Sequence, residues 1–161
     1  MEKYKNLIIK VLALIYRYLN ISNELYEQKK LRKKYNIDPT FIFNGEKILM
    51  YGDGVIIIGE NTYIGRHSSI QVTKGYQVRI GKNCKIGSCF KIWTQTSNVD
   101  NDFNIFPIEE KIGNIIIGNA VWIGANVVIS PGATVGDNSI IGANSVRSSI
   151  CHCRRCASQN H

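Results

Sequence analysis

A repeat of six residues constrains the fold of this chain more than any other feature of its sequence. An aliphatic residue, in most units followed by glycine, recurs every six positions in three runs, with ten residues between the first two runs and 25 between the last two. The repeated positions are Ile58, Ile64, Ile70, Ile80, Ile86, Ile92, Ile117, Ile123, Ile129, Val135 and Ile141. This period is typical of a β-helix in which each unit forms one short strand and a turn. Three units complete a triangular coil, so the sequence predicts an all-β solenoid of about four coils.

The repeat has a simple physical basis. The aliphatic side chain of each unit points into the prism, where it stacks on its equivalents in the coils above and below. Glycine, and asparagine two positions later, tolerate the backbone angles of a tight corner. These asparagines are Asn61, Asn83, Asn126, Asn138 and Asn144. A short solenoid also leaves an unpaired end coil and a flank of outward side chains, so we expect self-association.

Three regions follow from the pattern: residues 1–40 are expected to be helical, 52–146 to form the β-helix, and 147–161 to form an atypical tail. The apolar run 7–19 is interrupted by Lys10 and Arg17, lacks a cleavage site, and is shorter than the roughly 20 residues of a membrane span. A basic cluster follows at 29–34. Two interpretations stay open: a packed helix with a solvated basic face, or peripheral contact with an anionic membrane surface.

Composition limits the class of partner. The chain has 20 Lys and Arg against 12 Asp and Glu, a formal net charge of +8, which favours an anionic partner. Nucleic acid is the weakest choice, because aromatic residues do not alternate with basic ones as a base-stacking surface requires. Cys84 and Cys89 lie inside the repeats, where we expect reduced structural thiols of a cytoplasmic protein.

The repeat region is similar to a known family. Residues 116–132 read IIGNAVWIGANVVISPG, and residues 134–146 continue the pattern as TVGDNSIIGANSV. From Gly52 to Val146 the chain resembles the hexapeptide-repeat acyltransferase superfamily, with the bacterial sugar O-acetyltransferases of surface-polysaccharide pathways nearest in character. The resemblance implies a left-handed β-helix, a homotrimer, and acetyl-CoA as cosubstrate in the groove between neighbouring subunits, without a metal.

The same resemblance suggests where the cosubstrate lies. Its pantetheine arm would pass the corners Gly124-Ala125 and Gly142-Ala143, and Trp122 would pack beside it. The coil needs small residues at these corners whether or not a ligand binds. Residues 98–114 break the period and are expected to leave the prism as an excursion, which in relatives reaches a neighbour's active site. A plain insertion is the alternative.

The chain departs from the family where the excursion begins. Many relatives carry histidine there, in a segment such as Thr-Gln-Thr-His-Asn, and its imidazole takes the proton of the attacking sugar hydroxyl. In this chain Ser97 holds that position. Three explanations compete: the base lies elsewhere, at Asp100, Asp102 or His67; the protein is inactive; or the alignment is displaced by a few residues. For His67 an exposed corner residue is the simpler interpretation.

The tail is a second departure. Relatives continue with aliphatic residues that close the last coil, whereas here Arg147 stands where an inward aliphatic residue is expected. Cys151, Cys153 and Cys156 with His152 are too closely spaced for a zinc finger. Read one base later, codons 151–160 permit Val-Ile-Val-Ala-Gly-Val-Pro-Ala-Lys-Ile, which is similar to the family's ending. We therefore expect a frameshift near Arg147 and weakened binding of CoA.

The resulting functional hypothesis is an acetyl-CoA-dependent O-acetyltransferase that acts on a sugar hydroxyl in bacterial surface-polysaccharide biosynthesis. It would work in the cytoplasm or at the inner face of the cell membrane. Transfer would be direct, because no activated Ser or Cys nucleophile is evident. The alternative is a catalytically inactive trimeric scaffold. Serine O-acetyltransferases, amino-sugar N-acetyltransferases and γ-type carbonic anhydrases fit less well, the last because it needs a histidine cluster.

Overall fold

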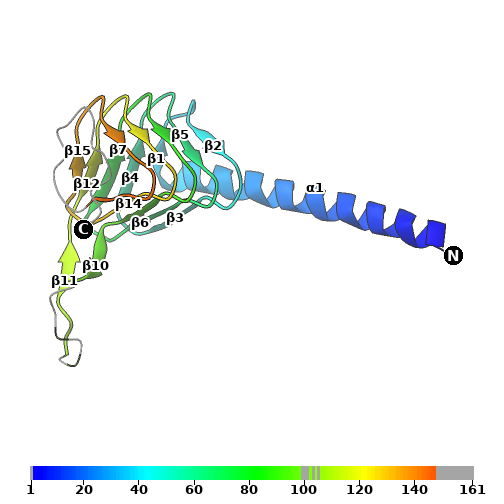
Figure 1. The fold of residues 1–161 in the computed structure, drawn as a ribbon, viewed down its shortest axis with the longest axis horizontal. Helices are drawn as coiled ribbons and strands as arrows, with labels where there is room; N and C mark the ends of the chain where they lie inside the picture. The colour runs from blue at the N-terminus through cyan, green and yellow to red at the C-terminus, as the bar shows by residue number, and fades with distance from the viewer. Residues whose placement is uncertain (1, 99–101, 103, 105, 148–161) are drawn as a thin grey trace. The chain divides into compact units, whose positions relative to one another are not determined.

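The computed structural model describes residues 2–98, 102, 104 and 106–147, and the chain divides into two units, Met1–Lys34 and Tyr35–His161. The first unit is one continuous helix, α1 (Glu2–Lys34), drawn in blue in Figure 1. The segment Asn20-Ile21-Ser22-Asn23, in which three of four residues are polar, does not interrupt it. Its last turn carries Arg32, Lys33 and Lys34, which interact favourably with the negative end of the helix dipole.

The second unit is a solenoid with three parallel sheets, each of which takes one strand from every coil (Figure 1). The first sheet contains β1 (Asn36–Ile37), β4 (Val55–Ile58), β7 (Gln77–Ile80), β12 (Ile115–Ile117) and β15 (Thr134–Val135). The second contains β2 (Ile42–Asn44), β5 (Tyr63–Gly65), β8 (Lys85–Ile86), β13 (Trp122–Ile123) and β16 (Ile140–Ile141). The third contains β3 (Leu49–Gly52), β6 (Ser69–Val72), β9 (Lys91–Trp93), β14 (Val128–Ile129) and β17 (Val146–Arg147).

These sheets confirm the predicted fold class and correct the number of coils. Each sheet has five strands, so the solenoid has five coils and not four. Its first strand begins at Asn36, before the predicted start at Gly52. The first coil escaped the repeat pattern because Phe43 and Met50 stand in register with Ile64 and Ile70, without the usual Ile-Gly pairs.

The core is the stack of repeated aliphatic residues. In the second sheet Ile64, Ile86, Ile123 and Ile141 follow one another in register and are fully or almost fully buried. The other two sheets carry equivalent rows, which include Ile80 and Ile92. Every core residue touches equivalents one coil away. Apolar surface is therefore buried only where the coil continues without a break.

The three edges of the prism differ in regularity. The first edge joins the first sheet to the second, and the second edge joins the second sheet to the third. The second edge in all five coils, and the first edge in every coil after the first, turn through a residue with positive φ, between 52° and 59°. These residues are Asn61, Asn83, Ala120 and Asn138 at the first edge, and Lys47, His67, Cys89, Asn126 and Asn144 at the second. The third edge, from the third sheet back to the first, varies in length from coil to coil and carries the excursion.

The last coil contains an anomaly at Arg147. This residue pairs with Ile129, whose side chain is fully buried, so it stands at an inward position of the third sheet. Its Nε and Nη2 atoms are buried and, among the residues that the structure describes, have no hydrogen-bond partner. The position agrees with the sequence argument that an aliphatic residue belongs there. The proposed frameshifted tail itself, residues 148–161, lies outside the described residues.

We predict that Arg147→Leu stabilises the protein. The substitution removes buried, unpaired nitrogen atoms and supplies apolar contacts on Ile129, so the free energy of unfolding should rise by about 1–3 kcal/mol. Urea unfolding of the full chain measures the change. Arg79→Leu, at an exposed position of β7, is the matched control and should alter stability by no more than about 0.5 kcal/mol. A loss of stability in Arg147→Leu would contradict the prediction.

Candidate active site

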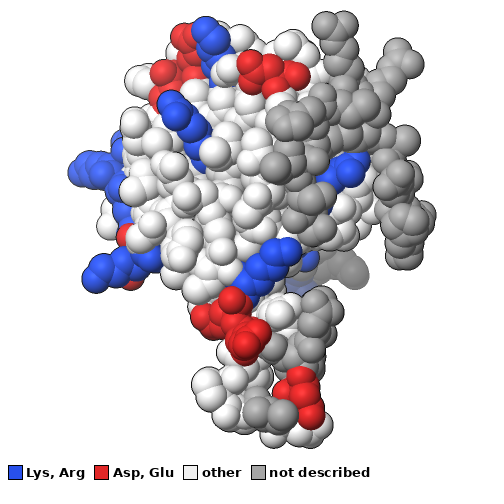
Figure 2. Space-filling model, turned by 90° about the vertical axis from the view of Figure 1, so that its left-hand side faces the viewer, with Lys and Arg blue, Asp and Glu red and all other residues white. Residues whose placement is uncertain are grey.

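The predicted excursion forms a β-hairpin at the third edge. Strands β10 (Gln95–Ser97) and β11 (Glu110–Ile112) pair antiparallel and project from the solenoid (Figure 1). Figure 2 shows charged side chains of both signs where this hairpin leaves the solenoid, below a broad uncharged face. The two described strands therefore place side chains beyond the regular surface of the prism.

Ser97 lies directly opposite Glu110 in this hairpin. Directly opposite residues of an antiparallel pair project from the same face, with their Cβ atoms roughly 5 Å apart. Both residues are exposed. The position that holds histidine in many relatives thus has a carboxylate as its cross-strand neighbour. Sequence analysis did not single out Glu110, because the excursion has no repeat from which strand register can be read.

A chain of hydrogen bonds fixes the Glu110 carboxylate at the base of the hairpin. The Gln95 side-chain amide donates to Glu110 Oε2 over 2.6 Å, and Thr73 Oγ1 donates to Gln95 Oε1 over 2.7 Å. Gln71 Nε2 donates to Thr73 Oγ1 over 2.9 Å, while Gln71 Oε1 accepts from the backbone N–H of Thr94 over 3.1 Å. The carboxylate is therefore positioned by side chains from both the solenoid and the hairpin.

The acidic candidates named from the sequence are less well placed. Asp102 is exposed, and its carboxylate accepts hydrogen bonds of 2.9 Å from the backbone N–H and from the side-chain amide of Asn104. These bonds lower the pKa of Asp102, with the backbone bond contributing most, and so make it a weaker base. Asp100 lies outside the described residues.

His67 lies at the second edge, away from the hairpin at the third. It is an exposed corner residue with a φ of 59°, and its backbone N–H donates to Glu46 O over 3.0 Å. Its Nε2 is 4.0 Å from Glu46 Oε1. It is the only histidine among the described residues, and it shares its corner position with Asn126 and Asn144. Within one chain the third sheet separates it from Ser97.

The predicted cosubstrate residues lie together at the second edge and on the adjoining sheet. Ala125 and Ala143 are exposed at successive corners, and Asn144 N donates to Ala125 O over 2.9 Å. Trp122, on β13, points outward and is 46% exposed. A Cβ atom on Gly124 would come within 2.5 Å of Ala143 N, so the coil itself requires this glycine.

A hollow at the first edge contains none of these residues. It measures about 300 Å³ and is lined by Asp38, Ile57, Gly59, Glu60, Arg79, Ile80, Gly81, Lys82 and Asn119. A Lys82–Glu60 ion pair of 3.7 Å spans two coils there. None of the site residues predicted from the sequence contributes to it. In the part of the chain that the structure describes, no three His, Cys, Asp or Glu side chains gather where they could hold a metal.

The solenoid consists of stacked six-residue units, has small residues at its corners and carries one projecting hairpin. Together these features define a class of protein. Two family models match it: the bacterial transferase hexapeptide (six repeats) over residues 114–146 and the hexapeptide repeat of succinyl-transferase over residues 55–88. These two matches support a relationship to the hexapeptide-repeat acyltransferase superfamily.

Individual relatives agree with this family. The galactoside O-acetyltransferase of Escherichia coli K12 is 36% identical over 100 residues, which cover 55% of this chain and 45% of the relative. A hexapeptide-repeat acetyltransferase of Vibrio cholerae, VCA0836, solved with acetyl-CoA, is 26% identical with a TM-score of 0.61, over 81% of this chain and 70% of that one. The polysialic-acid-specific acetyltransferase NeuO is 27% identical with a TM-score of 0.56, over 74% and 62%. The chain spans about half the length of the curated relatives it matches.

Proposed function

We propose that this protein is an acetyl-CoA-dependent O-acetyltransferase that acts on a sugar hydroxyl in bacterial surface-polysaccharide biosynthesis. The observation that carries the proposal is the hairpin carboxylate, Glu110, fixed opposite Ser97 on a hexapeptide solenoid. The relatives support the chemistry: one is named for galactoside O-acetylation, one was solved with acetyl-CoA, and one modifies polysialic acid.

In this proposal Glu110 is the general base. Its carboxylate takes the proton of the acceptor hydroxyl as the hydroxyl oxygen attacks the thioester carbonyl carbon. A C–O bond forms, the C–S bond breaks, and the departing CoA thiolate receives the proton. Gln95 keeps the carboxylate oriented, and the Ser97 hydroxyl is placed to hydrogen-bond the acceptor. Asp100, Asp102 and His67 are the other bases that the sequence suggests, with Asp102 disfavoured by its lowered pKa.

A covalent acyl-enzyme has little support. Cys84 is buried within the coil, and burial raises the pKa of its thiol, which also donates to Gly118 O over 3.1 Å. A neutral buried thiol is a poor nucleophile. Ser97 has no imidazole beside it within the described part of the hairpin. Direct transfer from acetyl-CoA to the acceptor is therefore the mechanism that we propose.

We also propose that the working form is a homotrimer. The residues predicted to bind acetyl-CoA lie at the second edge, whereas the hairpin leaves from the third, so one chain alone keeps the two halves of the site apart. The outward row on the second sheet runs through Ile42, Tyr63, Lys85, Trp122 and Ile140, so that exposed apolar residues lie on both sides of an exposed lysine. Burial of Ile42, Trp122 and Ile140 against a neighbour would stabilise assembly and bring one chain's hairpin toward the next chain's corners.

We predict that Glu110→Gln lowers kcat for sugar acetylation by about 10²–10⁴-fold, because the amide cannot accept the hydroxyl proton, while the affinity for acetyl-CoA stays unchanged. Release of the CoA thiol with a panel of sugar acceptors measures turnover, and calorimetry measures acetyl-CoA binding. Glu109→Gln is the matched control, since residue 109 lies next to Glu110 but projects from the opposite face of the hairpin. Full activity in Glu110→Gln would show that another residue is the general base.

We further predict that Ser97→His raises turnover by about 10²-fold, because an imidazole opposite Glu110 gains both an orienting carboxylate and a pKa near neutrality. Adding Glu110→Gln to this variant should remove most of the gain. Thr96→His places the same imidazole on the opposite face of β10 and should give no gain. Equal rates in both histidine variants would show that position 97 does not face the acceptor.

A trimeric scaffold without catalytic activity is the second candidate. It is favoured by the absence of histidine from the described part of the hairpin and by the buried guanidinium of Arg147 in the last coil. One assay distinguishes the two candidate functions. Acetyl-CoA binding with turnover in the parent chain supports the enzyme, whereas a stable trimer that neither binds nor cleaves acetyl-CoA, even after Arg147→Leu and Ser97→His, supports the scaffold.

A further inference from the structure

Helix α1 carries a broad surface of exposed apolar side chains. Every large apolar or aromatic side chain from Tyr4 to Tyr26 is between 46% and 73% exposed. They are Tyr4, Leu7, Ile8, Ile9, Val11, Leu12, Leu14, Ile15, Tyr16, Tyr18, Leu19, Ile21, Leu25 and Tyr26. An apolar surface of this extent marks a contact with another apolar phase or partner.

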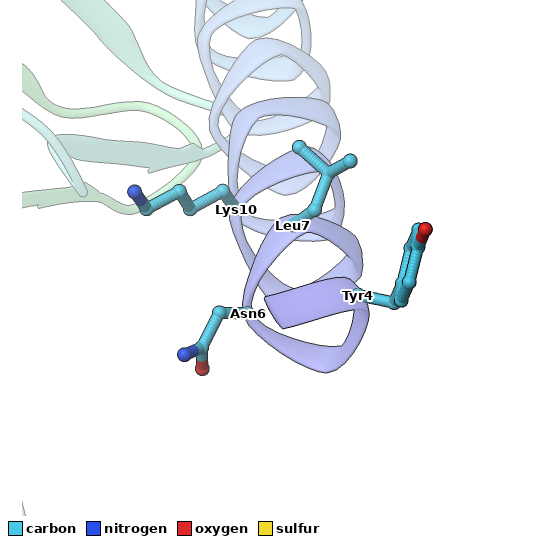
Figure 3. A pocket seen from close by; sticks show the side chains of 4 residues that line it. All are labelled: Tyr4, Asn6, Leu7 and Lys10. Atoms are coloured by element: carbon cyan, nitrogen blue, oxygen red, sulfur yellow. The ribbon is translucent and has the colours of Figure 1, made fainter. Parts of the chain in front are cut away.

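These side chains gather mainly on one half of the helix. With about 3.6 residues per turn, Val11, Ile15 and Tyr18 centre one half, whereas Arg17 and Asn20 lie on the other. Figure 3 shows the division in the first turns: Tyr4 and Leu7 point to one side of α1, and Asn6 and Lys10 point to the other. Because these four side chains diverge, the hollow that they line is an open surface and not an enclosed ligand pocket. We call the half centred on Val11 and Ile15 the apolar face.

The charge of α1 is strongly positive. It contains nine Lys and Arg against three Glu, a net charge of +6, which is most of the +8 carried by the whole chain. Lys10 and Arg17 lie on the polar half, and a further group occupies residues 29–34. A negatively charged surface is the complement of this helix, and each basic residue held near an anionic bilayer strengthens binding by about 1 kcal/mol, or fivefold.

We propose that α1 lies in the surface of an anionic phospholipid bilayer, with the apolar face among the acyl chains and the basic groups among the phosphates. Four tyrosines on the helix suit the boundary between headgroups and acyl chains. No helix among the described residues is long and apolar enough to cross a membrane. The helix would therefore lie along the surface.

Self-association through α1 fits the pattern less well. A coiled coil buries a narrow stripe of residues spaced alternately by three and four. In α1 the apolar residues come in adjacent pairs and triplets, such as Leu7-Ile8-Ile9 and Leu14-Ile15-Tyr16, and so cover about half of the circumference. Lipid acyl chains cover such a wide face, whereas one partner helix leaves much of it in water. Like charges at residues 29–34 of neighbouring copies would also repel each other.

The inference rests on α1 alone and does not depend on the proposed acetyl transfer. If both hold, the enzyme meets its acceptor at a membrane, as suits a glycan precursor attached to a lipid. The two fail separately, because transfer to a soluble sugar uses residues of the solenoid and hairpin, whereas vesicle binding uses residues 4–34.

Co-sedimentation of the full chain with vesicles tests the inference. We expect binding to vesicles that contain phosphatidylglycerol, little binding to phosphatidylcholine alone, and a loss of binding as salt is raised. Ile15→Glu, at the centre of the apolar face, should weaken binding at least about tenfold, since it removes an apolar side chain that would lie among the acyl chains. Asn20→Glu makes the same change of charge on the polar half and should weaken binding no more than about fivefold.

Circular dichroism must show equal helix content in both variants, and light scattering reports the oligomeric state. Acetylation of a soluble sugar should be the same in the parent and in Ile15→Glu. Failure of the parent to bind phosphatidylglycerol vesicles would overturn the proposal. Equal losses in the two variants would overturn the role of the apolar face, and loss of the oligomer in Ile15→Glu alone would reassign that face to self-association.

Discussion

The stacking of aliphatic side chains, coil on coil, is the constraint on which the rest of the solenoid depends. Ile64, Ile86, Ile123 and Ile141 each fill the space left by the one before, in register and out of water. No coil has a core of its own, so each is stable only while its neighbours hold their positions. Arg147 shows the cost of a break in the equivalent row of the third sheet, since its buried nitrogen atoms have no hydrogen-bond partner among the described residues.

This constraint explains which parts of the structure could be predicted from the sequence. Wherever an inward aliphatic residue recurs every six positions, the strand, its register and its buried face follow from the repeat alone. The first coil was missed because half-buried Phe43 and buried Met50 stand where the next coil has Ile64 and Ile70, and because these two residues lie seven and not six positions apart. A core position requires only an apolar side chain of suitable volume. The repeat, however, was recognised mainly from one particular pair of residues, isoleucine followed by glycine.

The candidate site could be predicted only where it lies on the repeat. The corners at Ala125 and Ala143, and the outward side chain of Trp122, have positions set by the period. The pairing of Ser97 with Glu110 is set by how two short polar strands meet, and neither carries an apolar pattern that would fix its register. Sequence reasoning therefore sought a replacement base in Asp100, Asp102 or His67, whereas the strand partner of Ser97 lies 13 positions along the chain.

The irregular third edge has a consequence for how such proteins diversify. Thr73 and Thr94, from successive coils, are joined there by a hydrogen bond beside the hairpin, while the other two edges turn through nearly identical corners in every coil after the first. Residues can be inserted or deleted at the third edge without displacing the core isoleucines. New acceptor specificities could then arise through insertions at this edge, while the stacked rows, on which stability depends, accumulate only conservative exchanges.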